Sequence, residues 1–148
     1  MSLKRGKYLI FDERGNLISR LLYEDKSFAG PKVPIVKHVR PIPPDPATWT
    51  VEPLIGGKPN TYVLSNRDAA TDESNGLVWA NGDSILPPPS WIIFPLPGKH
   101  NRYYITREDD SERPGGSWVV PEGDEQAQIK FFSPSVRPSE FQFVHILD

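Results

Sequence analysis

The triplet Tyr8-Leu9-Ile10 recurs in related form as Tyr62-Val63-Leu64 and as Tyr103-Tyr104-Ile105, and each copy opens one third of the chain. Each third closes on an aromatic residue that is followed two positions later by an apolar one: Trp49 and Val51, Trp91 and Ile93, Phe141 and Phe143. The opening and closing residues are 41 (8 to 49), 29 (62 to 91) and 38 (103 to 141) positions apart. Because spacings of this size are typical of internal repeats, we infer three related units.

The chain is interrupted too often to form long helices. Its 148 residues include 17 prolines and 11 glycines, and proline ends a helix because it has no amide hydrogen to donate. No window carries an apolar stripe at helical spacing that is free of Pro or Gly. The apolar residues form short runs rich in Val, Ile, Tyr, Trp and Phe, which is the composition of strands. We therefore expect an all-β fold.

The expected strands follow these short apolar runs. They cover residues 7–11, 17–22, 33–39, 49–54, 61–65, 77–79, 91–94, 102–107, 118–120, 129–132 and 141–147. The polar segment from Asn66 to Asn75 is predicted to be a loop. The strand from Leu77 to Trp79 is matched with the second strand of the other two units.

These runs give eleven strands, close to the twelve, four in each unit, that we expect for a β-trefoil: a six-stranded barrel capped by three hairpins. One domain is expected to span residues 1–148. Closing the barrel removes exposed strand edges, and the repeated aromatic residues then become layers of the core, as do the four tryptophans. A sandwich of similar strand content is the alternative, and the threefold spacing argues against it. In a trefoil, function is expected in the loops.

The overall composition excludes several classes of partner. The formal net charge is −2, which gives no strong field to attract nucleic acid or an anionic membrane surface. The chain has no cysteine, so it has no disulfide and no thiolate ligand, and this favours an intracellular origin. The segment Met1 to Lys7 lacks the apolar core of a secretory signal. We expect a cytoplasmic monomer without a nucleic acid or membrane partner.

Catalytic signals are weak. The three histidines, His38, His100 and His145, lie in different units, and their spacing does not suggest a metal site. The carboxylate pairs, such as Asp12-Glu13 and Asp109-Asp110, fall in expected turns, where solvation explains them better than acid–base chemistry. We predict that the protein is not an enzyme and that it has no catalytic residue, metal or cofactor.

The loop after the second expected strand is the most suggestive segment. Its residues Glu24-Asp25-Lys26-Ser27-Phe28 place one basic residue before a small one. A trypsin-like protease accepts this arrangement, because its anionic specificity pocket binds a cationic side chain. An extended loop that is already fixed loses little entropy on docking. From these residues alone a solvated lysine in an ordinary turn is the simpler interpretation, since Lys-Ser is a common dipeptide.

Three stretches near the N-terminus change that balance: Gly6-Lys7-Tyr8-Leu9-Ile10, Gly15-Asn16-Leu17-Ile18-Ser19-Arg20 and Glu24-Asp25-Lys26-Ser27. They closely resemble the N-terminal sequences of the cospin-like inhibitors, the mushroom (basidiomycete) family of β-trefoil serine protease inhibitors. The resemblance is strongest over about the first 35 residues and weaker around Trp49, Tyr62 and Trp118. It implies inhibition of trypsin-like proteases through the loop between the second and third strands. Lys26 would then precede the scissile bond and Ser27 would follow it, with Glu24, Asp25 and Phe28 flanking them.

Two other functions stay open. A trefoil lectin would carry Gln two residues before each closing aromatic residue, where this chain has Ala47, Pro89 and Ser139. Cysteine or asparaginyl protease inhibitors use other loops of a cysteine-free trefoil. Asn66 and Asn75 are the alternative protease-binding residues, because an asparaginyl endopeptidase cleaves after Asn. From these residues alone, a turn that uses Asn for its positive φ is the simpler interpretation.

Overall fold

The computed structural model describes residues 3–22, 32–83, 87–109, 115–133 and 135–146. Within these ranges the chain forms thirteen strands and one short 3₁₀ helix. The elements are β1 (Gly6–Phe11), β2 (Leu17–Arg20), β3 (Lys32–His38), η1 (Asp45–Ala47), β4 (Trp49–Pro53), β5 (Thr61–Asn66), β6 (Ala69–Ser74), β7 (Leu77–Asn81), β8 (Trp91–Pro95), β9 (Arg102–Arg107), β10 (Gly116–Val119), β11 (Ala127–Gln128), β12 (Lys130–Phe132) and β13 (Phe141–His145). None of the described helices has the length and apolar character needed to cross a membrane.

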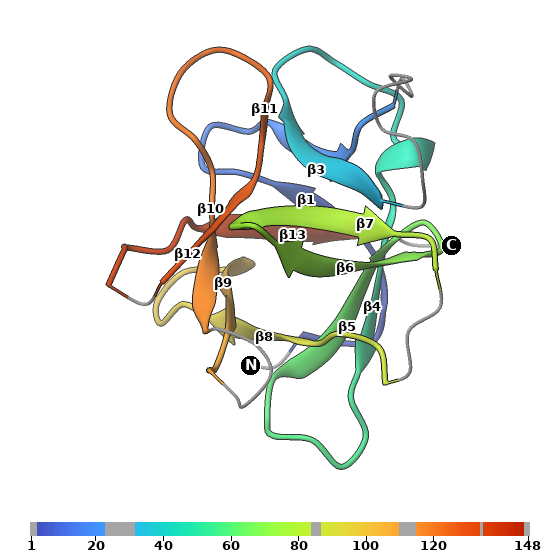
Figure 1. Ribbon diagram of the computed structural model, residues 1–148, viewed down its shortest axis with the longest axis vertical. Coiled ribbons are helices and arrows are strands. Elements are labelled where there is room, and N and C mark those ends of the chain that lie inside the picture. The colour runs from blue at the N-terminus through green and yellow to red at the C-terminus, as the bar shows by residue number, and fades with distance from the viewer. Residues whose placement is uncertain (1–2, 23–31, 84–86, 110–114, 134, 147–148) are drawn as a thin grey trace.

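The strands that open and close the three units join into a closed ring. In the described residues β1 pairs with β4, β4 with β5, β5 with β8, β8 with β9, β9 with β13, and β13 with β1, always antiparallel. Figure 1 shows β1 and β13 side by side, so the first and last strands complete the ring. A closed ring leaves none of its own edges free to pair with another chain.

The remaining strands lie over one end of this ring. The described hairpins are β2 with β3, β6 with β7, and β10 with β12. They contact one another through β3 with β7, β7 with β12, and β11 with β3. Gly116 begins β10 where two segments of the backbone approach closely: a Cβ there would clash with the carbonyl oxygen of Phe132. Only glycine fits that contact without a shift of the backbone.

The all-β prediction and the closed barrel are confirmed. The expected loop from Asn66 to Asn75 is wrong, since it contains strand β6. Polar residues hid this strand, but Thr71 is buried; its hydroxyl donates to the Leu64 carbonyl oxygen at 2.7 Å and accepts from the Trp91 indole at 2.9 Å. Leu77 to Trp79 is consequently the third strand of its unit, and its match to the second strands was wrong. The expected strand 129–132 corresponds to β12, which begins at Lys130, and the short strand β11 before Ile129 was not expected.

Aromatic side chains fill the barrel beneath the hairpins. Trp49, Trp91 and Trp118 are fully buried, whereas Trp79 is only half-buried, so three of the four tryptophans match the expected core. The ring of Trp118 lies 6.1 Å from that of Trp49 and 5.4 Å from that of Trp91, in tilted and edge-on contacts. Such contacts add to the stabilisation that each large apolar ring gains from burial.

The opening tyrosines form a second layer near the other end of the barrel. The Tyr62 hydroxyl donates to the Leu3 carbonyl oxygen at 2.7 Å, and the Tyr8 hydroxyl donates to that of Lys4 at 2.6 Å. Burial raises the pKa of Tyr8, Tyr62 and Tyr103 above the ordinary value of 10.0, and mutual repulsion between their ionised forms adds to the effect for Tyr8 and Tyr62. The layer therefore resists ionisation.

This layer predicts loss of stability in alkali. Unfolded tyrosines ionise near pH 10.0, whereas these folded ones stay protonated to higher pH. As the pH rises, loss of protons therefore stabilises the unfolded state before it stabilises the folded state. Stability should be fully present below about pH 10 and fall as the pH rises through the folded pKa values. Ultraviolet absorbance titration should show delayed ionisation of these tyrosines in the folded protein. Ionisation of all tyrosines at pH 10.0 before unfolding would contradict the prediction.

Candidate functional site

The predicted protease-binding residues Glu24, Asp25, Lys26, Ser27 and Phe28 lie outside the described residues. The structure does describe the two chain ends between which they lie. The segment follows Leu22, just after β2, and it ends before Lys32, which begins β3.

The entry to the segment is held by hydrogen bonds on both edges of β2. One edge pairs with β3 from Leu17 to Arg20, and the amide of Leu21 donates to the Pro34 carbonyl oxygen at 2.9 Å. On the other edge, side chains take the place of a strand. The Trp49 indole donates to the Ile18 carbonyl oxygen at 2.7 Å, and the Arg20 amide donates to Asn66 Oδ1 at 3.1 Å.

The exit from the segment is also paired on two sides. Lys32, Val33 and Pro34 of β3 lie opposite Asn81, Ala80 and Trp79 of β7. On its other edge the same end of β3 is joined to β2 by the Leu21 amide. Both ends of the segment are therefore fixed to neighbouring strands: β3 pairs with β2 on one edge and with β7 on the other, and Figure 1 shows β3 beside β7.

A buried Ser–His pair lies beside the entry. Ser19 Oγ is 2.8 Å from His38 Nε2, and it donates to the Arg20 carbonyl oxygen at 3.0 Å. His38 Nε2 is also 3.3 Å from that carbonyl oxygen. Burial lowers the pKa of His38 below its ordinary value, although the hydrogen bond to the Arg20 carbonyl opposes the shift. A neutral ring that donates from Nε2 to Ser19 fits this geometry.

The two alternative residues have opposite surroundings. Asn66 is fully buried at the end of β5, and its carboxamide is bonded to the backbone; this burial argues against its insertion into a protease. Asn75 is exposed at the tip of the hairpin between β6 and β7. Its φ is 56°, and Gly76 follows with a φ of 75°, as a two-residue hairpin turn requires.

The structure also shows polar features that the sequence did not single out. The side chain of Lys37 is only 1% exposed, and its Nζ donates to the carbonyl oxygens of Pro121 and Gly123 at 2.7 Å each. Asp12 is also buried; its carboxylate accepts from the amides of Arg14 and Asn16 at 2.9 Å each. Asp12 lies in the expected turn, but it is buried and bonded to the backbone, so the expected solvation of this carboxylate was wrong.

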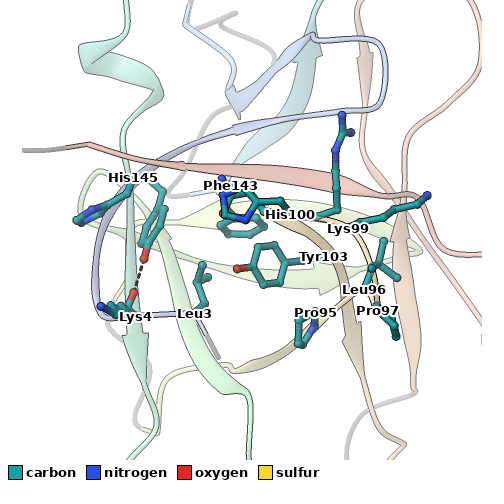
Figure 2. Close-up of a pocket in the computed structure, with 14 residues that line it drawn as sticks. Leu3, Lys4, Pro95, Leu96, Pro97, Lys99, His100, Tyr103, Phe143 and His145 are labelled. Atoms are coloured by element: carbon teal, nitrogen blue, oxygen red, sulfur yellow. Dashed lines mark hydrogen bonds between the residues drawn. The ribbon is translucent and has the colours of Figure 1, made fainter. Parts of the chain in front are cut away.

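A cavity of about 740 Å³ opens beside the tyrosine layer. Its wall includes His100 and His145 from two different units, and Figure 2 shows these side chains around it together with Tyr103. The cavity thus brings together two histidines that lie far apart in the sequence, and both side chains are exposed at its wall. Among the described residues, no group of three or more His, Cys, Asp or Glu side chains could hold a metal ion.

The closed ring of strands and the fixed ends of β2 and β3 are typical of a loop-presenting all-β protein, in which a closed barrel holds the ends of its loops. The model of the family described as Peptidase inhibitor I66 matches residues 1–144. The chain therefore belongs to the peptidase inhibitor I66 family, whose members inhibit proteases and are not enzymes. The predictions of a fungal inhibitor family and of a protein that is not an enzyme are confirmed at this level.

Solved structures agree with the fold. A proteinase inhibitor from Coprinopsis cinerea has a TM-score of 0.70 at 21% identity, over 98% of this chain and 100% of that one. A salivary protein of the Cysteine and Tryptophan-Rich family from a Culex mosquito gives 0.66 at 13%, over 98% and 96%. SeviL, solved bound to asialo-GM1 saccharide, gives 0.66 at 12%, over 97% and 100%. At these identities the likeness concerns the fold alone. No curated protein matches this chain in sequence.

The buried His38 predicts loss of stability in mild acid. Because its folded pKa lies below the ordinary value of 6.5, the unfolded state binds the proton first as the pH falls. The stabilisation is complete above pH 6.5 and declines below it, through the folded pKa. His38 lies in the wall of a second cavity, of about 650 Å³, which Arg40, Asp124 and Glu125 also line. Thermal unfolding should show a shallower decline for His38→Gln than for the wild type between about pH 7 and pH 5; equal declines would contradict a role for His38.

Proposed function

We propose that the protein is a reversible inhibitor of trypsin-like serine proteases that acts by substrate-like insertion of the loop between β2 and β3. Lys26 enters the anionic specificity pocket, Ser27 follows the scissile bond, and Glu24, Asp25 and Phe28 flank them. Membership of a peptidase inhibitor family supports the general activity. The Lys-Ser dipeptide supports the choice of protease and loop, because a cationic side chain complements an anionic pocket.

The observation that carries this proposal is the fixation of both loop ends. β2 is bonded on two edges where the segment begins, and β3 is bonded on two edges where it ends. Ordering a free peptide of this length would cost several kcal/mol. A loop whose ends are already fixed loses less entropy on binding, so more of the contact energy appears as affinity.

Fixed ends also account for slow hydrolysis. The protease serine attacks the Lys26 carbonyl carbon, the bond to the Ser27 nitrogen breaks, and the catalytic histidine gives its proton to the leaving amine. Water then hydrolyses the acyl-enzyme, or the Ser27 amine attacks it and restores the peptide bond. The Ser27 amine stays close because β3 remains paired with β2 and β7, and this proximity favours resynthesis over hydrolysis.

We also propose that the scaffold is a β-trefoil formed by one domain. The closed ring of six described strands and the three hairpins at one of its ends support this assignment. A single cluster of buried apolar residues, from Leu3 to Phe143, supports one domain. The monomeric state and the cytoplasmic location stay predictions.

Lys26→Ala should weaken trypsin inhibition by several kcal/mol, because it removes a charged anchor from the specificity pocket. The free energy of unfolding should change by less than about 0.5 kcal/mol, as expected for a loop side chain. Inhibition constants for trypsin, with papain as a control protease, measure the effect. Full inhibition by the variant would place the binding site elsewhere.

Lys26→Leu should move the preference from trypsin towards chymotrypsin-like proteases, because an apolar side chain suits their apolar pocket. The ratio of the two inhibition constants reports this change, and Lys58→Leu on the turn between β4 and β5 is the matched control. If the ratio stays as it is in the wild type, Lys26 does not precede the scissile bond.

Asn75 favours a second candidate function, inhibition of an asparaginyl endopeptidase through the hairpin between β6 and β7. Asn75 is exposed at a tight turn, and the Gly76 amide donates to Glu73 Oε2 at 2.8 Å, which fixes the turn. Asn75→Ala would abolish inhibition of such a protease without changing that of trypsin. A panel that includes legumain and papain distinguishes the two functions.

A further inference from the structure

Asn66 lies where the proposed inhibitory mechanism needs the chain to be fixed, although its side chain takes no part in the reaction with the protease. Its side chain is fully buried, and it joins two separate parts of the backbone. Its Oδ1 accepts from the Arg20 amide at 3.1 Å, and its Nδ2 donates to the Thr48 carbonyl oxygen at 3.3 Å. A buried carboxamide is normally retained only where its hydrogen bonds are satisfied. Here both partners are backbone groups, and one of them is the last peptide of β2.

We propose that Asn66 is a positioning residue for the protease-binding loop: it fixes the Arg20 peptide and thereby the direction in which the chain leaves β2. This inference rests on the proposed function. Asn66 does not contact the protease. It acts through the backbone that leads to Lys26, and it holds that backbone to the start of β4 and the end of β5, which belong to the barrel ring.

Arg20 is held at its carbonyl as well as at its amide. The carbonyl oxygen accepts from Ser19 Oγ at 3.0 Å, and His38 Nε2 lies close to both oxygens. The amide belongs to the peptide before the Arg20 Cα and the carbonyl to the peptide after it. The two sets of contacts therefore fix two consecutive peptides at the end of β2.

The surrounding strands explain why a side chain is needed here. Within the part of the chain that the structure describes, β2 pairs with β1 only at Phe11 and Leu17, and beyond that point no described strand lies along its outer edge. The Trp49 indole satisfies the Ile18 carbonyl, and Asn66 satisfies the Arg20 amide. Removal of the carboxamide would leave the half-buried Arg20 amide without this partner, which costs free energy. The Thr48 carbonyl oxygen would still accept from the Arg67 amide at 3.1 Å.

The test compares the full-length wild type with Asn66→Ala and with Thr71→Val as the matched control. Thr71 is equally buried and also makes two hydrogen bonds, to Leu64 and Trp91, but it has no bond to β2. Both variants should therefore lower the melting temperature. The measurements are the trypsin inhibition constant, the rate at which trypsin cleaves the Lys26–Ser27 bond, and hydrogen exchange at the Arg20 amide.

Asn66→Ala should raise the inhibition constant by about tenfold or more, as loss of buried hydrogen bonds at the loop entry implies. It should also speed cleavage of the Lys26–Ser27 bond and accelerate exchange at Arg20. Thr71→Val should leave all three close to the wild type. Wild-type values in Asn66→Ala, or equal losses in Thr71→Val, would overturn the inference.

The experiment also distinguishes a variant that does not fold from a failure of the proposed function. If Asn66→Ala does not fold, Asn66→Asp keeps an acceptor for the Arg20 amide and loses the donor to Thr48; it should retain Arg20 protection, and fast Arg20 exchange would overturn the inference. If the wild type does not inhibit trypsin, the proposed function fails. Arg20 exchange needs no protease, so it still decides whether Asn66 holds the loop entry.

Discussion

The closed ring of antiparallel strands is the constraint on which the rest of the structure depends. β1 pairs with both β4 and β13, so the beginning of the chain joins the first unit to the last. Closure satisfies the backbone of the ring strands and places their alternate side chains inside. The aromatic residues meet there in two layers, one of tryptophans and one of tyrosines. Each layer draws residues from all three units, so no unit buries its aromatic side chains alone.

Residues of the ring also fix the strand that leads into the candidate inhibitory loop. Trp49 and Asn66 belong to ring strands or their ends, yet their polar atoms bind the outer edge of β2. The same core that stabilises the barrel thus also fixes the peptide that precedes the candidate inhibitory loop. Family membership establishes protease inhibition as the class of activity, and these bonds give it a physical basis, because a loop with fixed ends binds with a smaller loss of entropy.

The sequence predicted the strands that carry the repeated aromatic and apolar residues. The tyrosine-led triplets located β1, β5 and β9, and the closing aromatic residues located β4, β8 and β13. It missed β6, whose alternation of Ala69, Thr71 and Glu73 is not apolar, because the Thr71 hydroxyl is satisfied only by residues distant in sequence. Asn66 looked like a surface residue for the same reason: nothing in its local sequence shows that Arg20 and Thr48 will surround it. Whether a polar residue can be buried depends on hydrogen-bond partners that the tertiary structure supplies, and the periodicity of the sequence does not show those partners.

The most direct test of the account is to find the bond that trypsin attacks. The intact protein is incubated with a small amount of trypsin, and the cut is located by mass spectrometry while native gel filtration follows the two fragments. The account predicts one slow cut, between Lys26 and Ser27, with the fragments still associated through the closed barrel. A cut at another position, or rapid degradation without a stable complex, would contradict it.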